Sequence, residues 1–184
     1  VPGRVLTAAL TANALKPCAL NLINACVTQG RFPKRWKVGK LVLLRKDGRP
    51  LEEPTSYRPI VLLDEIGKLF ERLLVARIIE HLDEVGPGLA ETQFGFRRGR
   101  STLDAIGRVK NLSEQATAAG QVVLAVSIDI ANAFNTLPWE CIGEALRYHR
   151  MPLYLRRILM SYLSNRFVEC KTREGYVRRW RMTR

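Results

Sequence analysis

Asp129 is the residue whose type and position indicate chemistry most directly. It follows the apolar run at 122–128, and residues 111–140 contain no Lys or Arg. A carboxylate at the end of a buried strand is costly to desolvate unless a cation or a hydrogen-bond donor faces it, and hard divalent cations bind carboxylate oxygens. Asn132 and Asn135 follow closely, so a strand-end carboxylate that caps the following turn explains the pattern equally well. The local pattern leaves metal binding and capping open.

The cysteines and histidines point to no further site. Four cysteines and two histidines are spread along the chain: Cys18, Cys26, Cys141, Cys170, His81 and His149. There is no Cys-x-x-Cys pair and neither histidine lies at zinc-ligand spacing from a cysteine, which argues against zinc. Without a Gly-x-Ser-x-Gly motif, a hydrolase triad is not indicated either. We expect Cys26, which falls on an apolar helical face, to pack as a small hydrophobic residue.

Positive charge is the main compositional bias. The 184 residues include 30 Lys or Arg against 17 Asp or Glu, a formal net charge of +13, and 22 of the basic residues are Arg. Three separated blocks carry the excess: residues 31–58 carry +6, residues 97–110 carry +4 and residues 141–184 carry +8. Planar guanidinium groups suit phosphate oxygens. We therefore expect a polyanionic partner, nucleic acid, rather than simple solubility, to explain the charge.

Hydropathy argues against a membrane protein and a secreted one. No apolar run reaches the roughly 18 residues that cross a bilayer, and residues 1–10 lack the basic region and cleavage site of a signal peptide. An intracellular, reducing compartment is therefore expected. Hydrophobic residues make up 47% and charged residues 26%, which is typical of a folded domain or of two lobes that share a core. Because the first residue is not Met, we expect a piece of a longer protein.

The periodicity of apolar residues alternates between that of helices and that of strands. The predicted elements are helices at 4–15, 17–29, 64–86 and 101–120, strands at 37–45, 58–63 and 121–130, helices starting at Pro138 and Pro152, and a hairpin of 166–172 with 176–182. Asp64 and the pair Ser101 and Asp104 should cap their helices. The apolar run at 122–128 predicts a central strand buried on both faces. This is a mixed α/β (α+β) pattern, with helices packed on a mixed or antiparallel sheet.

Four segments occur in the order and spacing of one protein family. The first is Arg-Phe-Pro-Lys-Arg-Trp-Lys at 31–37, and the second is Tyr-Arg-Pro-Ile at 57–60, which is followed by Lys68, Glu71 and Arg77. The third is Gln-Phe-Gly-Phe-Arg at 93–97, which is followed by Gly99 and Ser101-Thr102. The fourth is Asp-Ile at 129–130, which is followed by Ala-Phe-Asn at 133–135. From about residue 31 onward the chain resembles the reverse transcriptases of retrotransposons without long terminal repeats (non-LTR). It looks most like the arthropod elements that insert into ribosomal RNA genes. The resemblance implies the fingers and a partial palm of a right-hand polymerase.

The resemblance also assigns a reaction centre. Asp129 matches the aspartate that binds both catalytic Mg²⁺ ions in the family, with help from the backbone carbonyl that here belongs to Ile130. In such enzymes two metal ions clamp the attacking 3′-hydroxyl and the leaving pyrophosphate. Phe134 matches the aromatic steric gate that rejects a 2′-hydroxyl, and an ordinary buried phenylalanine after a strand is the alternative.

Basic residues complete the implied site. Arg58 and Arg97 match residues that the family uses around the incoming triphosphate. Arg97 is the better supported, because its glycine-flanked segment can approach phosphate closely. Gln93 looks like the residue that helps to place the template strand. Arg98 and Arg100 are expected either to be solvated or to contact the template backbone.

Two further motifs of the family are missing from these residues: a Gly-Pro-Gln-Gly segment and the aromatic-Ala-Asp-Asp hairpin with the remaining metal ligands. We therefore expect an N-terminal fragment with an incomplete active site, in which 1–30 form a helical extension, 31–120 the fingers with palm-connecting helices, and 121–184 a partial palm. The leading hypothesis is a reverse transcriptase by lineage that is inactive as an isolated fragment. The alternative is a degenerate remnant that only binds nucleic acid without sequence preference.

The implied partners follow from the first hypothesis. They are an RNA template, a DNA primer, deoxynucleoside triphosphates and the rest of a polyprotein, with a later palm, a thumb and an expected endonuclease. The expected location is the nucleus, at the site of integration.

Overall fold

The structure, a computed structural model, describes residues 8, 11, 15–130, 133–172 and 174–183, without the side chains of residues 134 and 135. The chain forms two compact units: a first unit of Val1–Gly86 with Leu137–Arg184, and a second unit of Pro87–Thr136. The predicted boundary between fingers and palm concerns functional subdomains of a polymerase, so it stays a prediction. Most of the helix predicted at 4–15 lies outside the described residues.

Local capping sets the ends of the first two long helices of the first unit. Helix α2 (Lys16–Gln29) has Pro17 in its first turn and ends at Gly30, whose φ of 63° lies in the left-handed region that favours glycine. Helix α3 (Glu65–Glu84) follows Asp64, whose Oδ1 accepts a 2.7 Å hydrogen bond from a backbone N–H of the first turn. Both helices are confirmed close to their predicted bounds.

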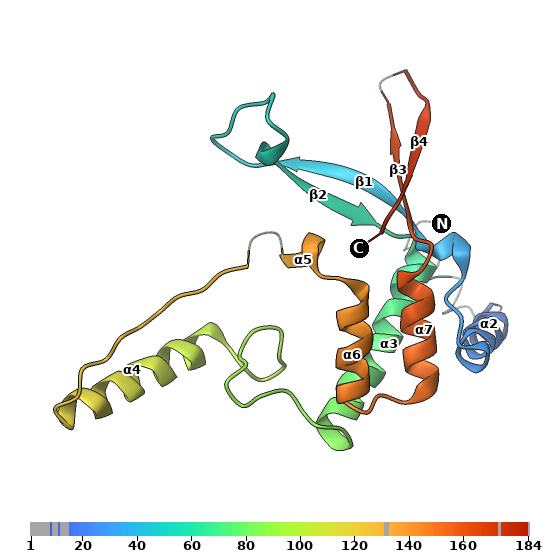
Figure 1. Cartoon of the computed structure of the whole chain (residues 1–184). Helices are drawn as coiled ribbons and strands as arrows, with labels where there is room; N and C mark the ends of the chain where they lie inside the picture. The colour runs from blue at the N-terminus through green and yellow to red at the C-terminus, as the bar shows by residue number, and fades with distance from the viewer. Residues whose placement is uncertain (1–7, 9–10, 12–14, 131–132, 173, 184) are drawn as a thin grey trace. The chain divides into compact units, whose positions relative to one another are not determined.

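Two shorter helices complete the helical part of this unit. Helix α6 (Trp139–Tyr148) follows Pro138, and helix α7 (Leu153–Leu163) follows Pro152, as predicted. Helices α3, α6 and α7 lie side by side in Figure 1. No helix in the described part of the chain combines the length and the apolar character of a membrane span.

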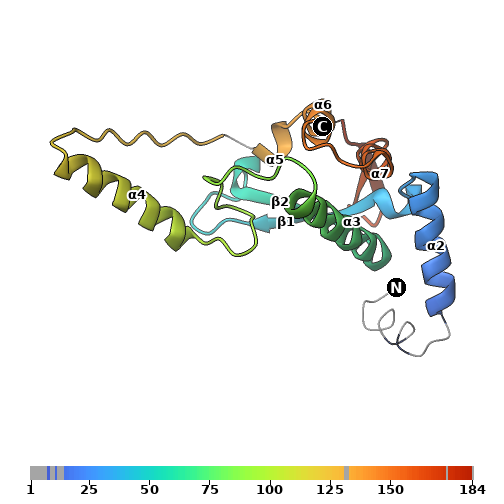
Figure 2. The ribbon, with the colours of Figure 1, turned by 90° about the horizontal axis from the view of Figure 1, so that it is seen from below.

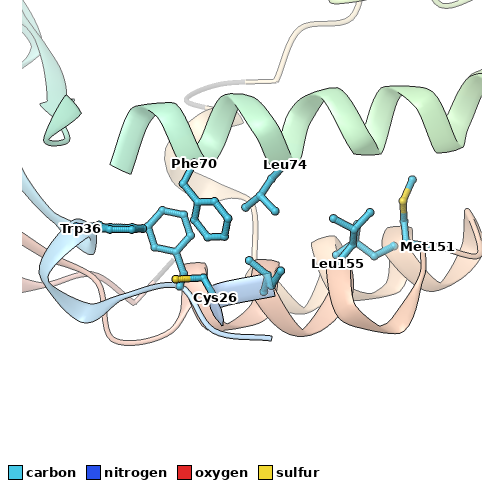
Figure 3. Packing of buried hydrophobic residues seen from close by; sticks show 9 residues of the cluster. Cys26, Trp36, Phe70, Leu74, Met151 and Leu155 are labelled. Carbon is cyan, nitrogen blue, oxygen red and sulfur yellow. The ribbon is translucent and has the colours of Figure 1, made fainter. Parts of the chain in front are cut away.

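The core of the first unit is an apolar cluster where α2, α3, α6 and α7 meet the 3₁₀ turn η1 (Lys34–Lys37). Its buried members are Cys26, Phe32, Trp36, Phe70, Leu74, Leu146, Met151, Leu155 and Ile158. The ring centroid of Phe32 lies 5.1 Å from that of Phe70 and 4.6 Å from that of Tyr162. Figure 3 shows the side chains of α3 directed at those of α2 and α7. Cys26 packs in this cluster, so the prediction for its thiol is confirmed.

A four-stranded mixed sheet leads away from this core. It consists of β1 (Val38–Arg45), β2 (Tyr57–Leu62), β3 (Phe167–Lys171) and β4 (Val177–Arg181), in the order β2-β1-β3-β4. Strand β1 is antiparallel to β2 and parallel to β3, and β3 and β4 form the predicted antiparallel hairpin. The β1–β2 ribbon extends away from α2 and α7 in Figures 1 and 2. The predicted α/β class is confirmed.

Lys37 joins the turn η1 to the end of α7. This residue is 4% exposed, and its Nζ donates to the carbonyl oxygens of Ser161 at 2.7 Å and Ser164 at 2.8 Å. The last carbonyls of a helix lack intrahelical donors, so the ammonium group supplies them. Burial lowers the pKa of Lys37, and the nearby cations Lys34 and Arg166 lower it further.

The second unit contains one long helix with a reciprocal cap. Helix α4 (Thr102–Ala118) begins at Ser101, whose Oγ accepts a 3.2 Å hydrogen bond from the Asp104 N–H. The Asp104 carboxylate in turn accepts a 2.7 Å bond from the Ser101 N–H. This is the predicted capping box. The short helix α5 (Ala133–Thr136) ends the unit.

The predicted central strand at 121–130 is wrong in this structure. These residues form no strand, and their side chains are exposed, 98% for Val122 and 87% for Ile128. A strand buried on both faces needs hydrogen-bonded neighbours at its edges and a layer of structure on each face. Among the described residues the sheet is made of the four strands above, and none of them pairs with this segment. Apolar composition alone does not supply such neighbours.

Candidate nucleotide and nucleic-acid site

Residues 87–101 form an arginine loop in the second unit, organised around Glu91. The Glu91 carboxylate accepts from Arg97 Nη2 at 3.2 Å and from Arg100 Nη2 at 2.5 Å. Arg97 Nη1 also donates to the carbonyl oxygen of Ala90 at 3.0 Å. Arg97, predicted to bind the triphosphate, and Arg100, predicted to be solvated or to contact the template backbone, are therefore held by one carboxylate on their own loop.

The electrostatics of the loop follow from this clamp. Hydrogen bonding from Arg97 lowers the pKa of Glu91 below its usual range, and the charges of Arg97 and Arg100 lower it further. The Glu91 side chain is 74% exposed, so each ion pair stabilises the fold only slightly. The guanidinium of Arg100 also lies over the Phe94 ring, with Cζ 5.6 Å from the ring centroid. These ion pairs and the ring contact thus hold the loop together.

The remaining polar residues of the arginine loop face solvent. Gln93 donates from Nε2 to the carbonyl oxygen of Gly95 at 3.4 Å, and Arg98 is exposed. Phe96 is 99% exposed and has a φ of 57°. A left-handed backbone at a bulky residue carries strain, and such strain concentrates at binding sites. The structure brings Gln93 together with Arg97, Arg98 and Arg100 on one loop.

Arg58 belongs to the first unit and lies on β2. In the register of the ribbon it stands opposite Leu44, and its side chain is exposed. Residues two apart on a strand share a face, so Arg58 shares one with Ile60 and Leu62, which are 37% and 43% exposed. Its proposed role beside the triphosphate stays a prediction.

Asp129 and Ile130 lie on the exposed segment before α5. The described residues contain no group of three or more His, Cys, Asp or Glu side chains that could hold a metal ion. One carboxylate and one backbone carbonyl are too few oxygen ligands for two Mg²⁺ ions. These residues alone therefore do not fit a two-metal centre. Phe134 lies in α5, but its side chain falls outside the described residues, so the steric-gate assignment stays a prediction.

Glu91 is the residue of this site that the sequence reasoning missed. It is the only acid among residues 87–101, which also contain three arginines. A lone acid in a basic loop is the signal that could have identified it, because opposite charges close in sequence tend to pair. Its partners lie six and nine residues later in the chain, a separation that no helix or strand period indicates.

Relatives of known description share most of this chain but are much longer. The chain is 35% identical over 170 residues to the Drosophila melanogaster "Probable RNA-directed DNA polymerase from transposon BS", covering 91% of this chain and 18% of that protein. It is 31% identical over 171 residues to the "RNA-directed DNA polymerase from mobile element jockey" of the same species, covering 90% and 18%. It is 33% identical over 159 residues to the "Retrovirus-related Pol polyprotein from type-1 retrotransposable element R1" of Bradysia coprophila, covering 86% and 15%. The chain thus spans less than a fifth of these proteins.

A family model agrees with these likenesses. The model described as "Reverse transcriptase (RNA-dependent DNA polymerase)" matches residues 44–184. The narrower prediction of an element inserting into ribosomal RNA genes is not established, because the likeness extends to the transposon BS, jockey and R1 proteins at similar identity. For a complete enzyme the family implies a divalent metal ion, a nucleic-acid template and primer, and deoxynucleoside triphosphates. The chain belongs to the reverse transcriptase family, as a reverse transcriptase domain of a non-LTR retrotransposon.

Proposed function

We propose that this chain forms the fingers and part of the palm of an RNA-directed DNA polymerase that adds deoxynucleotides to a DNA primer on an RNA template. The match of the reverse transcriptase model to residues 44–184 carries the proposal. That span contains Arg58, the arginine loop and Asp129 in the order that the family uses. The assignment of fingers to 31–120 and of a partial palm to 121–184 belongs to the same proposal.

In this proposal the arginine loop receives the triphosphate of the incoming nucleotide. A triphosphate offers more charge and more acceptor oxygens than the Glu91 carboxylate, so it competes for the Arg97 guanidinium. The exchange costs little, because the exposed pair with Glu91 is weak. The family resemblance assigns a triphosphate-binding role to Arg58 as well. The other polar members of the loop contact the template strand: Gln93, Arg98 and Arg100.

Asp129 and Ile130 provide the first oxygen ligands of the reaction centre in the proposal, and Phe134 screens the sugar. The described residues do not assemble a metal centre. We therefore propose that these 184 residues bind nucleic acid but do not polymerise on their own. Polymerisation needs the two family motifs that this sequence does not contain, since the aromatic-Ala-Asp-Asp hairpin brings the remaining carboxylates and the Gly-Pro-Gln-Gly segment lines the nucleotide pocket.

A second candidate is a nucleic-acid-binding module without catalysis. The absence of a carboxylate cluster among the described residues favours it, as do the exposed cations of β2 and β4. Sequence-blind binding needs only phosphate contacts. The two candidates differ in whether DNA synthesis depends on Asp129 once the missing motifs are supplied.

We further propose that the chain belongs to a polyprotein of a mobile element, with a later palm, a thumb and an endonuclease. The R1 relative is described as a polyprotein, and this chain covers 15% of it. Insertion into ribosomal RNA genes, and action in the nucleus at the site of integration, complete this proposal.

Primer extension tests the catalytic role. The chain is joined to the Gly-Pro-Gln-Gly and aromatic-Ala-Asp-Asp motifs of a relative and given an RNA template, a DNA primer and Mg²⁺. Asp129→Ala should abolish extension while template binding persists, and Asp47→Ala, which removes an exposed turn carboxylate, should not. Phe134→Ala should admit ribonucleotides, because it vacates the space that a 2′-hydroxyl needs. Normal extension by Asp129→Ala would refute the assignment of a catalytic centre and favour the binding module.

Binding of the unmodified chain to labelled RNA tests the shared part of both candidates. We expect little sequence preference and an affinity that falls steeply with salt, by a slope of roughly 0.7 per neutralised phosphate for a single strand. An affinity that is constant from low to high salt would contradict both candidates.

A further inference from the structure

Tyr176, Arg178 and Trp180 lie on one face of the β3–β4 hairpin. Arg178 pairs with Cys170, and Trp180 pairs with Val168, across the antiparallel ladder. The ladder continues to Tyr176, whose carbonyl oxygen accepts a 2.8 Å hydrogen bond from the Thr172 N–H. Because side chains alternate between the faces of a strand, these three residues follow one another along the same face. The order is aromatic, cation, aromatic.

All three side chains of this row are accessible. Tyr176 is 74% exposed, Trp180 is 49% exposed, and Arg178 is exposed as well. Within the described part of the chain, Arg178 makes no hydrogen bond or ion pair with another side chain. The row therefore offers two accessible rings and an exposed guanidinium group.

The opposite face of β4 is different. Arg179 donates from Nε to Glu169 at 2.7 Å and lies over the Phe167 ring, with Cζ 5.3 Å from the ring centroid. Arg181 donates from Nη2 to Asn165 Oδ1 at 2.8 Å. The two arginines of that face already have acceptors. The neighbouring residues Arg178 and Arg179 thus carry the same charge, but Arg179 is paired with Glu169, whereas Arg178 has no side-chain partner among the described residues.

We propose that the row Tyr176, Arg178 and Trp180 binds a single-stranded polynucleotide. Bases stack on the two rings, and the Arg178 guanidinium binds a phosphate between them. Aromatic platforms interleaved with cations are the physical basis of sequence-tolerant single-strand binding. Residues two apart on a strand are separated by about 6.8 Å, so the three side chains span the reach of two or three nucleotides. The proposal rests on the nucleic-acid-binding role proposed above and adds a surface outside the arginine loop.

The surrounding charge favours this occupant over a protein. Residues 141–184 carry a net +8, and Lys171 adds a further exposed cation at the end of β3. The acids of the hairpin are Glu169, which is paired on the other face, and Glu174 in the turn. A protein partner would need a matching acidic patch, whereas every polynucleotide carries phosphates along its length.

Fluorescence anisotropy with the full 184-residue chain tests the proposal. The probe is a labelled oligothymidylate of about 20 nucleotides, compared with a DNA duplex of the same length. We expect Trp180→Leu to weaken single-strand binding roughly tenfold, as for a lost base–aromatic stack. Arg178→Gln should lower the salt slope by roughly 0.7, whereas Arg179→Gln, with the same change in charge, should leave the slope unchanged.

Tryptophan fluorescence provides an independent readout. Trp36 is buried and Trp139 is half-buried, so Trp180 is the most exposed indole of the chain. Stacking should quench it when the oligonucleotide is added, and the quenching should disappear in Trp180→Leu. Circular dichroism checks that this variant folds. Tyr176→Leu is the second variant, because a ring that is 74% exposed contributes little to folding.

The binding results of these variants separate the proposed row from a general effect of net charge. Equal losses in Arg178→Gln and Arg179→Gln would overturn the proposal, because they would show that only net charge matters. Wild-type affinity in both Trp180→Leu and Tyr176→Leu, or preference for the duplex, would overturn it as well. Failure of the wild-type chain to bind any oligonucleotide would instead refute the nucleic-acid-binding role itself. Selective loss in Arg178→Gln together with lost quenching supports the proposal.

Discussion

Replacement of Lys37 by methionine should destabilise the first unit by about 2 kcal/mol. Lys37→Met keeps the length and the apolar stem of the side chain while it removes the ammonium group. That group donates to the carbonyl oxygens of Ser161 and Ser164, at the end of α7, from a residue that is 4% exposed. Because these two bonds join the turn η1 to the end of α7, the change tests how the turn holds the helix.

The magnitude follows from opposing effects. Hydrogen bonds from a charged donor stabilise a fold by about 2 kcal/mol each, so the two bonds together contribute about 4 kcal/mol. The buried ammonium is also costly to desolvate, and the lowered pKa of Lys37 reflects this cost. We assign about 2 kcal/mol to the desolvation that the variant recovers. Ser161 keeps a 3.0 Å bond from the hydroxyl of Ser164, which limits the loss.

Urea unfolding monitored by circular dichroism measures the effect as a free energy of unfolding. A loss of about 2 kcal/mol corresponds to a fall in Tm of roughly 6 °C for a chain of this size. Lys34→Met is the matched control, because it removes the same charge from an exposed position in the same turn and should change stability by less than about 0.5 kcal/mol. Equal stability of the two variants would refute the role of Lys37 as a cap of α7.

Three further changes test other contacts. The Tyr162 hydroxyl donates to a carboxylate, and burial raises the pKa of this hydroxyl above its ordinary value. The stability that comes from the neutral hydroxyl is present below pH 10 and is lost as the pH rises from there. The urea midpoint should therefore fall more between pH 8 and pH 11 in wild type than in Tyr162→Phe, and equal falls in the two proteins would contradict this. Gly39→Ala drives a Cβ into the Cγ1 methyl of Val61 and should cost about 1–3 kcal/mol in urea unfolding, whereas Gly95→Ala meets open space and should not. Glu91→Gln removes the negative charge that engages Arg100, the arginine proposed above to contact the template, so the salt slope of RNA binding should steepen by roughly 0.7 for one additional neutralised phosphate. An unchanged slope would argue against the clamp.

The parts of the fold that depend on neighbours within a few residues could be predicted from the sequence. Asp64 caps α3, and Ser101 with Asp104 caps α4, because the donors and acceptors involved lie three residues apart. Pro138 precedes α6 for an equally local reason. The four motif segments also identified the family, because their order and spacing are properties of the chain rather than of its packing.

The contacts between distant segments could not be predicted in this way, because they depend on how the helices and strands pack. The bond from Lys37 to Ser161 joins residues 124 positions apart, and no local pattern indicates that a lysine will be buried there. Glu91 clamps Arg97 because the loop folds back on itself, which depends on backbone turns rather than on periodicity. The segment at 121–130 is apolar yet exposed, because burial requires neighbours on both sides and composition specifies only the preference for them. Local hydrogen bonding is encoded within a few residues, whereas burial and long-range pairing depend on how the elements meet.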